Sequence, residues 1–191
     1  MTTLDLGPAT TTLAELVRSV DDDQLTAPTP CEEYAVGDLL DHIGGLALAF
    51  TGAARRQPVP GSENGGTGDA SRLEPGWRDR IAADLAELAE AWRDPAAYDG
   101  IASAGGVEMP GDIAAAVALN EVVVHGWDLA TALGQPYAPA EQDVAACLTF
   151  ARPFSTPETA AERGTAFGQV QPVPADADPL TELLALLGRR A

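Results

Sequence analysis

Apolar residues recur every three or four positions along most of this chain, and this spacing constrains its fold more than any other feature. Leu13, Leu16, Val17 and Val20 form one such stripe, which is typical of the buried face of an amphipathic helix. The alternation of apolar and polar residues that marks half-buried strands is nearly absent. The spacing therefore predicts an all-α protein.

The helical segments are separated by stretches rich in proline, glycine and aspartate, which provide start and stop signals. We expect long helices over residues 7–20, 36–56, 77–94 and 109–134, and shorter ones over 139–152 and 178–190. Residues 57–76 and 154–174 are expected to be long loops, and residues 95–111 a loop that leads into the fourth helix. Such lengths suit an antiparallel four-helix bundle with extra short helices and long loops.

Length and charge narrow the class of protein further. A chain of 191 residues with 46% hydrophobic content is expected to form one domain over residues 1–191. Its net charge of −18 makes nucleic acid and anionic membrane surfaces poor partners. The amino terminus has no signal-peptide pattern, and no apolar run approaches membrane-spanning length. We therefore expect a soluble cytoplasmic protein, either a monomer or a homodimer.

The segment NEVVVHGWD, residues 120–128, carries polar groups inside an otherwise apolar helix. Glu121, His125 and Asp128 fall within about 60° of one another around the helix axis. Val117 and Val124 lie on the same half of the helix, so this strip is expected to be buried. A buried carboxylate is costly unless it meets a cation, a hydrogen-bond donor or a metal, and the chain contains no lysine.

His42 is the other histidine of the chain, and it too lies in an apolar stretch, DLLDHIGGLALAF. If the second helix packs beside the fourth, His42, Glu121 and His125 meet in the bundle core, where facing helices often build such sites. Two imidazoles and one carboxylate suit zinc, and also nickel, iron or manganese, and they leave a coordination position open. The spacing thus indicates a catalytic type of metal site.

Structural roles account for the same residues equally well at this point. Glu121 and His125 can form a partly buried ion pair, and His42 can be a satisfied core histidine. Asp128 can orient the imidazole of a metal ligand or cap a neighbouring backbone group. Spacing alone leaves these alternatives open.

Two motifs carry a resemblance to a known family. TPCEEYAVGDLLDHIGG at residues 29–45 and NEVVVHGWDLATALG at residues 120–134 resemble the DinB-like superfamily. Within it the chain is most similar to the mycothiol-dependent maleylpyruvate isomerase, amino-terminal-domain-like branch of actinobacteria, and residues 167–189 resemble the ending of its small single-domain members. The resemblance implies a four-helix bundle with one divalent metal, commonly zinc, held by His42, Glu121 and His125.

The same resemblance implies a type of chemistry. Better characterised members bind a low-molecular-weight thiol, mycothiol, to the metal as thiolate, and add its sulfur to an electrophile or isomerise a double bond. We therefore expect a thiol-dependent transferase or isomerase, with Asp128 as a catalytic proton acceptor and a small thiol and an electrophile as partners. The alternative is a non-catalytic metal-binding sensor, stress-response or interaction domain.

Two departures from the family limit this implication. The isomerase has an additional carboxy-terminal domain that is not expected here, so isomerase activity itself is not implied. The usual aromatic-threonine or aromatic-serine pair at the start of the second helix is replaced by Tyr34-Ala35. Any anionic substrate would need arginines, and those in or beside predicted loops are Arg55, Arg56, Arg72 and Arg163.

Overall fold

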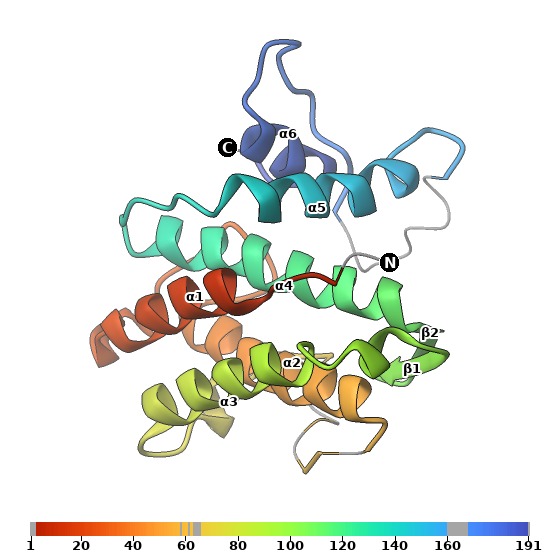
Figure 1. Cartoon of the computed structure of the whole chain (residues 1–191). Helices are drawn as coiled ribbons and strands as arrows, with labels where there is room; N and C mark the ends of the chain where they lie inside the picture. Colours follow the sequence, from red (N-terminus) through yellow and green to blue (C-terminus); the bar gives the residue numbers. More distant parts are fainter. Residues whose placement is uncertain (1–2, 58, 61, 63–65, 160–167, 191) are drawn as a thin grey trace. The chain divides into compact units, whose positions relative to one another are not determined.

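The computed structural model describes residues 3–57, 59–60, 62, 66–159 and 168–190 (Figure 1). The chain divides into two compact units, Met1–Pro139 and Ala140–Ala191. The first unit contains all the residues of the expected metal site. The expectation of one domain over residues 1–191 stays a prediction.

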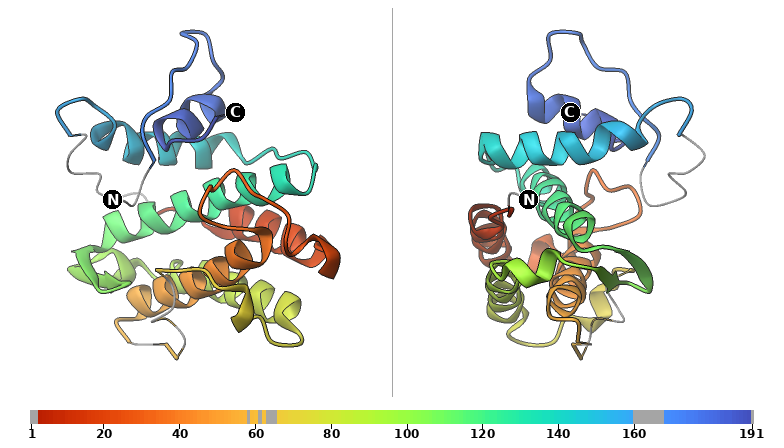
Figure 2. Two further views of the ribbon diagram at one scale, coloured as in Figure 1. Left: turned by 180° about the vertical axis from the view of Figure 1, so that it is seen from behind. Right: turned by 45° about the vertical axis from the view of Figure 1, so that its right-hand side comes forward.

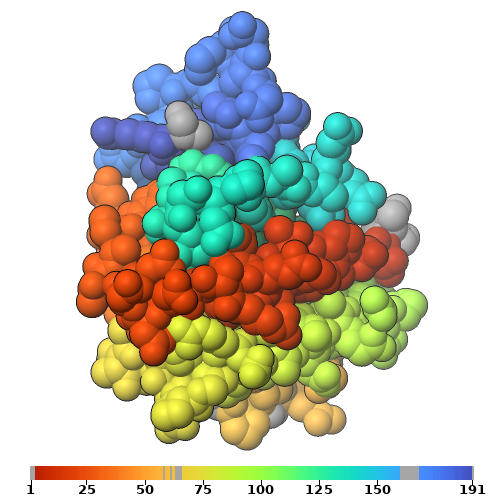
Figure 3. Space-filling model, turned by 90° about the vertical axis from the view of Figure 1, so that its left-hand side faces the viewer, coloured from red at the N-terminus to blue at the C-terminus, as the bar shows by residue number. Residues whose placement is uncertain are grey.

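The first unit is a four-helix bundle. Its helices are α1 (Gly7–Ser19), α2 (Val36–Arg55), α3 (Trp77–Ala91) and α4 (Gly111–Ala132). Helices α1 and α2 each contact both α3 and α4, so α1 lies diagonally across the bundle from α2 (Figure 2, right). On the face drawn in Figure 3, α1 lies directly beside the first part of α3. This arrangement confirms the expected all-α, DinB-like fold.

The predicted apolar stripes form the core of this bundle. Leu13 and Val17 of α1, Leu39 of α2 and Leu85 of α3 are almost completely buried, and each such side chain contributes about 1.5–3 kcal/mol through removal from water. Helix α4 is long and apolar enough to cross a membrane by length and composition, but 72% of its most apolar window is buried inside the protein. Such burial is typical of a core helix.

Residues 95–111 differ from the expected loop. They form a short 3₁₀ helix, η4 (Pro95–Tyr98), and a hairpin of two antiparallel strands, β1 (Ile101–Ala104) and β2 (Val107–Pro110). Gly105 and Gly106 connect the strands with φ of 58° and 80°, and positive φ at both positions is what a two-residue hairpin turn of type I′ requires. The prediction of a loop over residues 95–111 is therefore wrong, while the fold is mainly helical as expected.

The second unit contains α5 (Glu141–Ala151), the 3₁₀ turn η5 (Arg152–Phe154) and α6 (Pro179–Leu186), and α5 contacts α6. Arg152 donates two hydrogen bonds to the carboxylate of Glu182, with distances of 3.0 Å and 2.9 Å. Asp178 caps α6 by accepting from the backbone N–H groups of Leu180 and Thr181. Arg163 lies outside the described residues.

Candidate metal centre

The centre is formed where α2 packs against α4. His42 lies in the first half of α2, and Glu121 and His125 lie one turn apart near the middle of α4. One nitrogen of each imidazole and one oxygen of Glu121 lie within 4.8 Å of one another. The two imidazole rings meet edge to face, with centroids 5.0 Å apart. The structure thus brings the three predicted ligands together.

Both histidines are withdrawn from solvent, while the carboxylate is partly open to it. His42 and His125 are 9% and 6% exposed, and the Glu121 side chain is 22% exposed. Glu121 also borders a small space lined by apolar residues that include Ala118 and Val122. Of the three predicted ligands, Glu121 is therefore the one that solvent reaches most.

Asp128 lies behind His125, one turn further along α4. Its Oδ2 is 3.0 Å from Nδ1 of His125, and the residue is completely buried. On the other side of the same ring, Nε2 lies 3.0 Å from Oε2 of Glu121. The Nδ1–H of His125 thus donates to Asp128, and this contact leaves Nε2 directed at Glu121 and the centre.

The carboxylates of Asp128 and Glu121 determine the protonation state of His125. Burial by itself lowers the pKa of His125, but hydrogen bonds with Asp128 and Glu121 and the charges of both outweigh it and raise the pKa to about 9. When no metal is bound, the ring is therefore a cation near neutral pH, and its Nε2 proton joins His125 to Glu121. A metal ion at this centre would take the place of that proton.

The donor set fits a divalent metal. Ligands at about 2.1 Å from one tetrahedral ion lie roughly 3.4 Å apart, and the three donor atoms already lie within 4.8 Å of one another. Asp128 supplies the outer carboxylate that commonly orients a metal-ligating imidazole. Three ligands leave a coordination position for water or substrate. The residues present can thus hold zinc or a similar ion in an open site.

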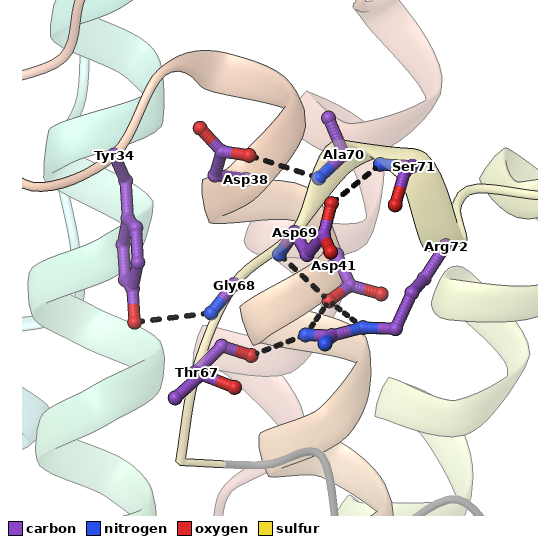
Figure 4. A network of polar contacts seen from close by, with 9 residues as sticks. All are labelled: Tyr34, Asp38, Asp41, Thr67, Gly68, Asp69, Ala70, Ser71 and Arg72. Atoms are coloured by element: carbon purple, nitrogen blue, oxygen red, sulfur yellow. Dashed lines mark hydrogen bonds and ion pairs between the residues drawn. The ribbon is translucent and has the colours of Figure 1, made fainter.

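Sequence reasoning missed a second layer of the site, which consists of Tyr34 and the segment Thr67–Arg72, here called the strap (Figure 4). Tyr34 precedes α2, and its ring lies 5.1 Å from that of His42. Burial raises the pKa of Tyr34, opposed by a hydrogen bond from Gly68 and reinforced by the charges of nearby residues that include Glu121. The tyrosine therefore lies beside the centre, next to His42.

The arginines considered as anion-binding residues are engaged elsewhere, as far as the structure describes them. Arg55 pairs with Glu87, and Arg56 donates to the backbone carbonyls of Ala97 and Asp99. Arg72 is in the strap, bound to Asp41 at 2.5 Å. Arg55 and Arg72 are thus paired with carboxylates, whereas the hydrogen bonds of Arg56 go to neutral carbonyl groups.

The chain is similar to a known family and to two mycobacterial proteins. Residues 6–130 match the family described as the mycothiol maleylpyruvate isomerase N-terminal domain. The chain is 31% identical over 192 residues to two relatives, "Uncharacterized protein Rv0738" of Mycobacterium tuberculosis strain H37Rv and "Uncharacterized protein MT0763" of strain CDC 1551, with 92% of this chain and 91% of each relative covered. No solved structure matches.

The match includes α2 and, up to residue 130, α4, with His42, Glu121, His125 and Asp128 inside it. It covers most of the first unit and more than half of the chain. The chain therefore belongs to the mycothiol maleylpyruvate isomerase N-terminal domain family.

Proposed function

We propose that this protein binds a divalent metal, zinc in the first place, through His42, Glu121 and His125, and uses it to activate mycothiol for attack on an electrophile. The observation that carries the proposal is the meeting of three donor groups from α2 and α4 within 4.8 Å. Nickel, iron and manganese suit the same donors. Membership of a mycothiol-related family supports the choice of thiol.

The metal would supply one effect, the lowering of the pKa of a thiol from about 8.5 so that the thiolate forms near neutral pH. The protein side chains around the metal would control the access of water and substrates to it. The imidazoles of His42 and His125 are buried, whereas Glu121 is partly exposed, so the thiol and its electrophile would reach the centre on the side of Glu121. The resulting activity is that of a thiol transferase, or of an isomerase that adds and expels the thiol.

We propose that Asp128 positions His125 instead of acting as a direct proton acceptor. Its carboxylate contacts Nδ1 and is completely buried, so it lies on the far side of the imidazole from Glu121. A group there can fix the ring and its tautomer. The protons released by the thiol would pass to solvent on the open side of Glu121.

Elemental analysis and thiol consumption test the function. Protein purified without added metal should contain close to one equivalent of a divalent metal, and it should consume mycothiol above background with some member of a panel of electrophiles. Metal binding without any thiol consumption would instead favour a sensor, stress-response or interaction domain. Equal metal contents of the wild type and a His125→Ala variant would exclude the proposed ligands.

An Asp128→Asn variant is expected to bind zinc about 10- to 100-fold more weakly, because outer partners of ligating histidines typically contribute that much to affinity. The amide keeps the size of the side chain, so the variant should still fold. Competition with a chelator at fixed pH measures the change. Asp143→Asn, a substitution of a buried aspartate of the second unit, is the matched control and should leave the affinity unchanged.

A further inference from the structure

A cavity of about 930 Å³, here called the hairpin cavity, lies between the last turns of α2 and the strand β1. One of its walls consists of α2 residues, most of them small: Ala49, Gly52, Ala53 and Arg56. A second wall contains all residues of β1 and the turn at residues 105–106, but only Glu108 of β2. The hairpin cavity therefore lies along the open edge of β1.

This open edge presents backbone groups that no other strand binds. The hairpin turn has two residues, so the residues that flank it form a hydrogen-bonded pair, and such pairs alternate with open ones along the ladder. The bond from the N–H of Gly111 to the carbonyl of Gly100 continues this alternation. Ile101 and Ser103 occupy the open positions, so their N–H and C=O groups point away from β2. Within the described part of the chain, no backbone partner is found for these groups.

Charge in the hairpin cavity is balanced. Arg56 and Glu108 contribute one positive and one negative side chain, and the hydrogen bonds of Arg56 go to neutral carbonyls. A polyanion would meet a single cation among the described lining residues. An apolar ligand would remove water from the open edge of β1 without replacing its hydrogen bonds, which is costly. The cavity thus suits an uncharged ligand that carries hydroxyl or amide groups.

The hairpin cavity follows the metal centre along both helices. Ala49 comes seven positions after His42, a spacing that places both on one side of α2. On α4, Val117 and Ile113 lie about one and two turns before Glu121, toward the hairpin, and both are partly exposed. Figure 1 shows the hairpin beside the start of α4. At about 1.5 Å per residue, the cavity begins roughly 10 Å from the centre.

We infer that the hairpin cavity binds the uncharged, hydroxyl-bearing end of the thiol, and that it thereby selects long thiols over short ones. The inference rests on the proposed function and assigns the choice of thiol to residues outside the metal centre. Mycothiol is an acetylated cysteine joined through an amide to a glucosaminyl inositol, so its sulfur and its hydroxyl-bearing rings lie at opposite ends. The open N–H and C=O groups of Ile101 and Ser103 bind the hydroxyls, and the small residues of α2 leave room for the rings.

Ala49→Leu tests the inference because the larger side chain fills the helical wall of the cavity. With an alkyl halide as electrophile, a carbon–sulfur bond replaces the carbon–halogen bond, halide leaves and the thiol proton passes to solvent. For mycothiol, kcat/KM should fall at least about tenfold. For N-acetylcysteine, which lacks the rings, it should stay within about twofold. Ala83→Leu makes the same change at an exposed position of α3 and should affect neither thiol.

Ser103→Pro is a second variant that leaves the packing of α2 untouched. Proline removes the N–H on the open edge and keeps the bonds to β2, which is why an edge strand tolerates it. With mycothiol, kcat/KM should fall about 3- to 10-fold, the effect of one lost neutral hydrogen bond. With N-acetylcysteine it should not change. The metal content of both variants should equal that of the wild type.

A binding measurement separates this inference from the proposed function. The probe is N-acetylglucosaminyl inositol, the sulfur-free end of mycothiol, and calorimetry should show that it binds the wild type more tightly than either variant. Equal kcat/KM of the wild type for both thiols, equal losses for both thiols in the variants, or no binding of the probe would overturn the inference alone. Binding of the probe without any thiol consumption by the wild type would overturn the proposed function, and the selection of thiols with it.

Discussion

A Glu121→Gln protein is expected to bind zinc more than about a hundredfold more weakly than the wild type, because loss of a charged ligand should exceed the 10- to 100-fold cost of losing an outer partner. The amide retains the size of the side chain but carries no charge and is a poor zinc ligand. Thiol consumption should fall in parallel, since the thiolate depends on the bound metal. Zinc affinity is measured by chelator competition, and activity by thiol titration.

Glu87→Gln is the matched control for this substitution. Glu87 lies on α3, and its exposed side chain pairs with Arg55, so loss of its charge should leave zinc affinity and turnover as they are. The melting temperatures of both variants should be measured, because they show whether weaker zinc binding arises from a lost ligand or from an unfolded protein. A Glu121→Gln protein that retains zinc with wild-type affinity would remove Glu121 from the proposed ligand set.

The sequence predicted the helices of the bundle well because their signals are local. Pro8 occupies the first turn of α1, and Gly134 follows the end of α4 with positive φ, as its sequence pattern indicates. The hairpin was missed because its strands have four residues each, too few to show a clear alternation. Gly105-Gly106 was the available signal, but a glycine pair is equally common in irregular loops.

The predicted ligands were found for a different reason. Polar residues on an apolar helix face need partners, and with two histidines in the chain the number of possible partners was small. The strap could not be predicted in this way, because Asp38 and Asp41 look like ordinary solvated residues in the sequence. Their partners come from residues 69–72, about 30 positions away, and only tertiary packing brings them together.

Tyr34 shows the same limit. The sequence revealed only that an alanine follows it where a capping hydroxyl is usual. In the structure, backbone carbonyls supply the acceptors: the N–H groups of Val36 and Gly37 donate to Ala27 and Leu25 at 2.9 Å and 2.8 Å. Because these first-turn N–H groups already have acceptors, the helix tolerates alanine at position 35, and Asp38 accepts from the backbone N–H groups of Ala35 and Ala70.

The stability of the metal-free protein is expected to fall as the pH rises from about 6.5 to about 9. The folded-state pKa of His125 is raised to about 9, whereas an exposed histidine titrates near 6.5. Folding therefore gains from the protonated ring fully below about 6.5, and this gain is lost as the pH rises through about 9. The melting temperature of chelator-treated wild-type protein should therefore drop by several degrees between these two pH values. The drop should be smaller in an Asp128→Asn variant, because its His125 has lost one of its two charged partners.

Zinc affinity should show the opposite pH dependence and rise with pH, because zinc must displace the Nε2 proton of His125. Below about pH 9 each unit of pH should raise the apparent zinc affinity about tenfold, and the zinc-bound protein should lose little stability over the same interval. Chelator competition between about pH 6.5 and 8.5 measures the slope, and calorimetry in buffers of different ionisation enthalpy counts the proton released. In Asp128→Asn the slope should level off at a lower pH, since the His125 proton is then held less tightly. An affinity independent of pH would mean that zinc binds without displacing that proton, and hence not through Nε2 of His125.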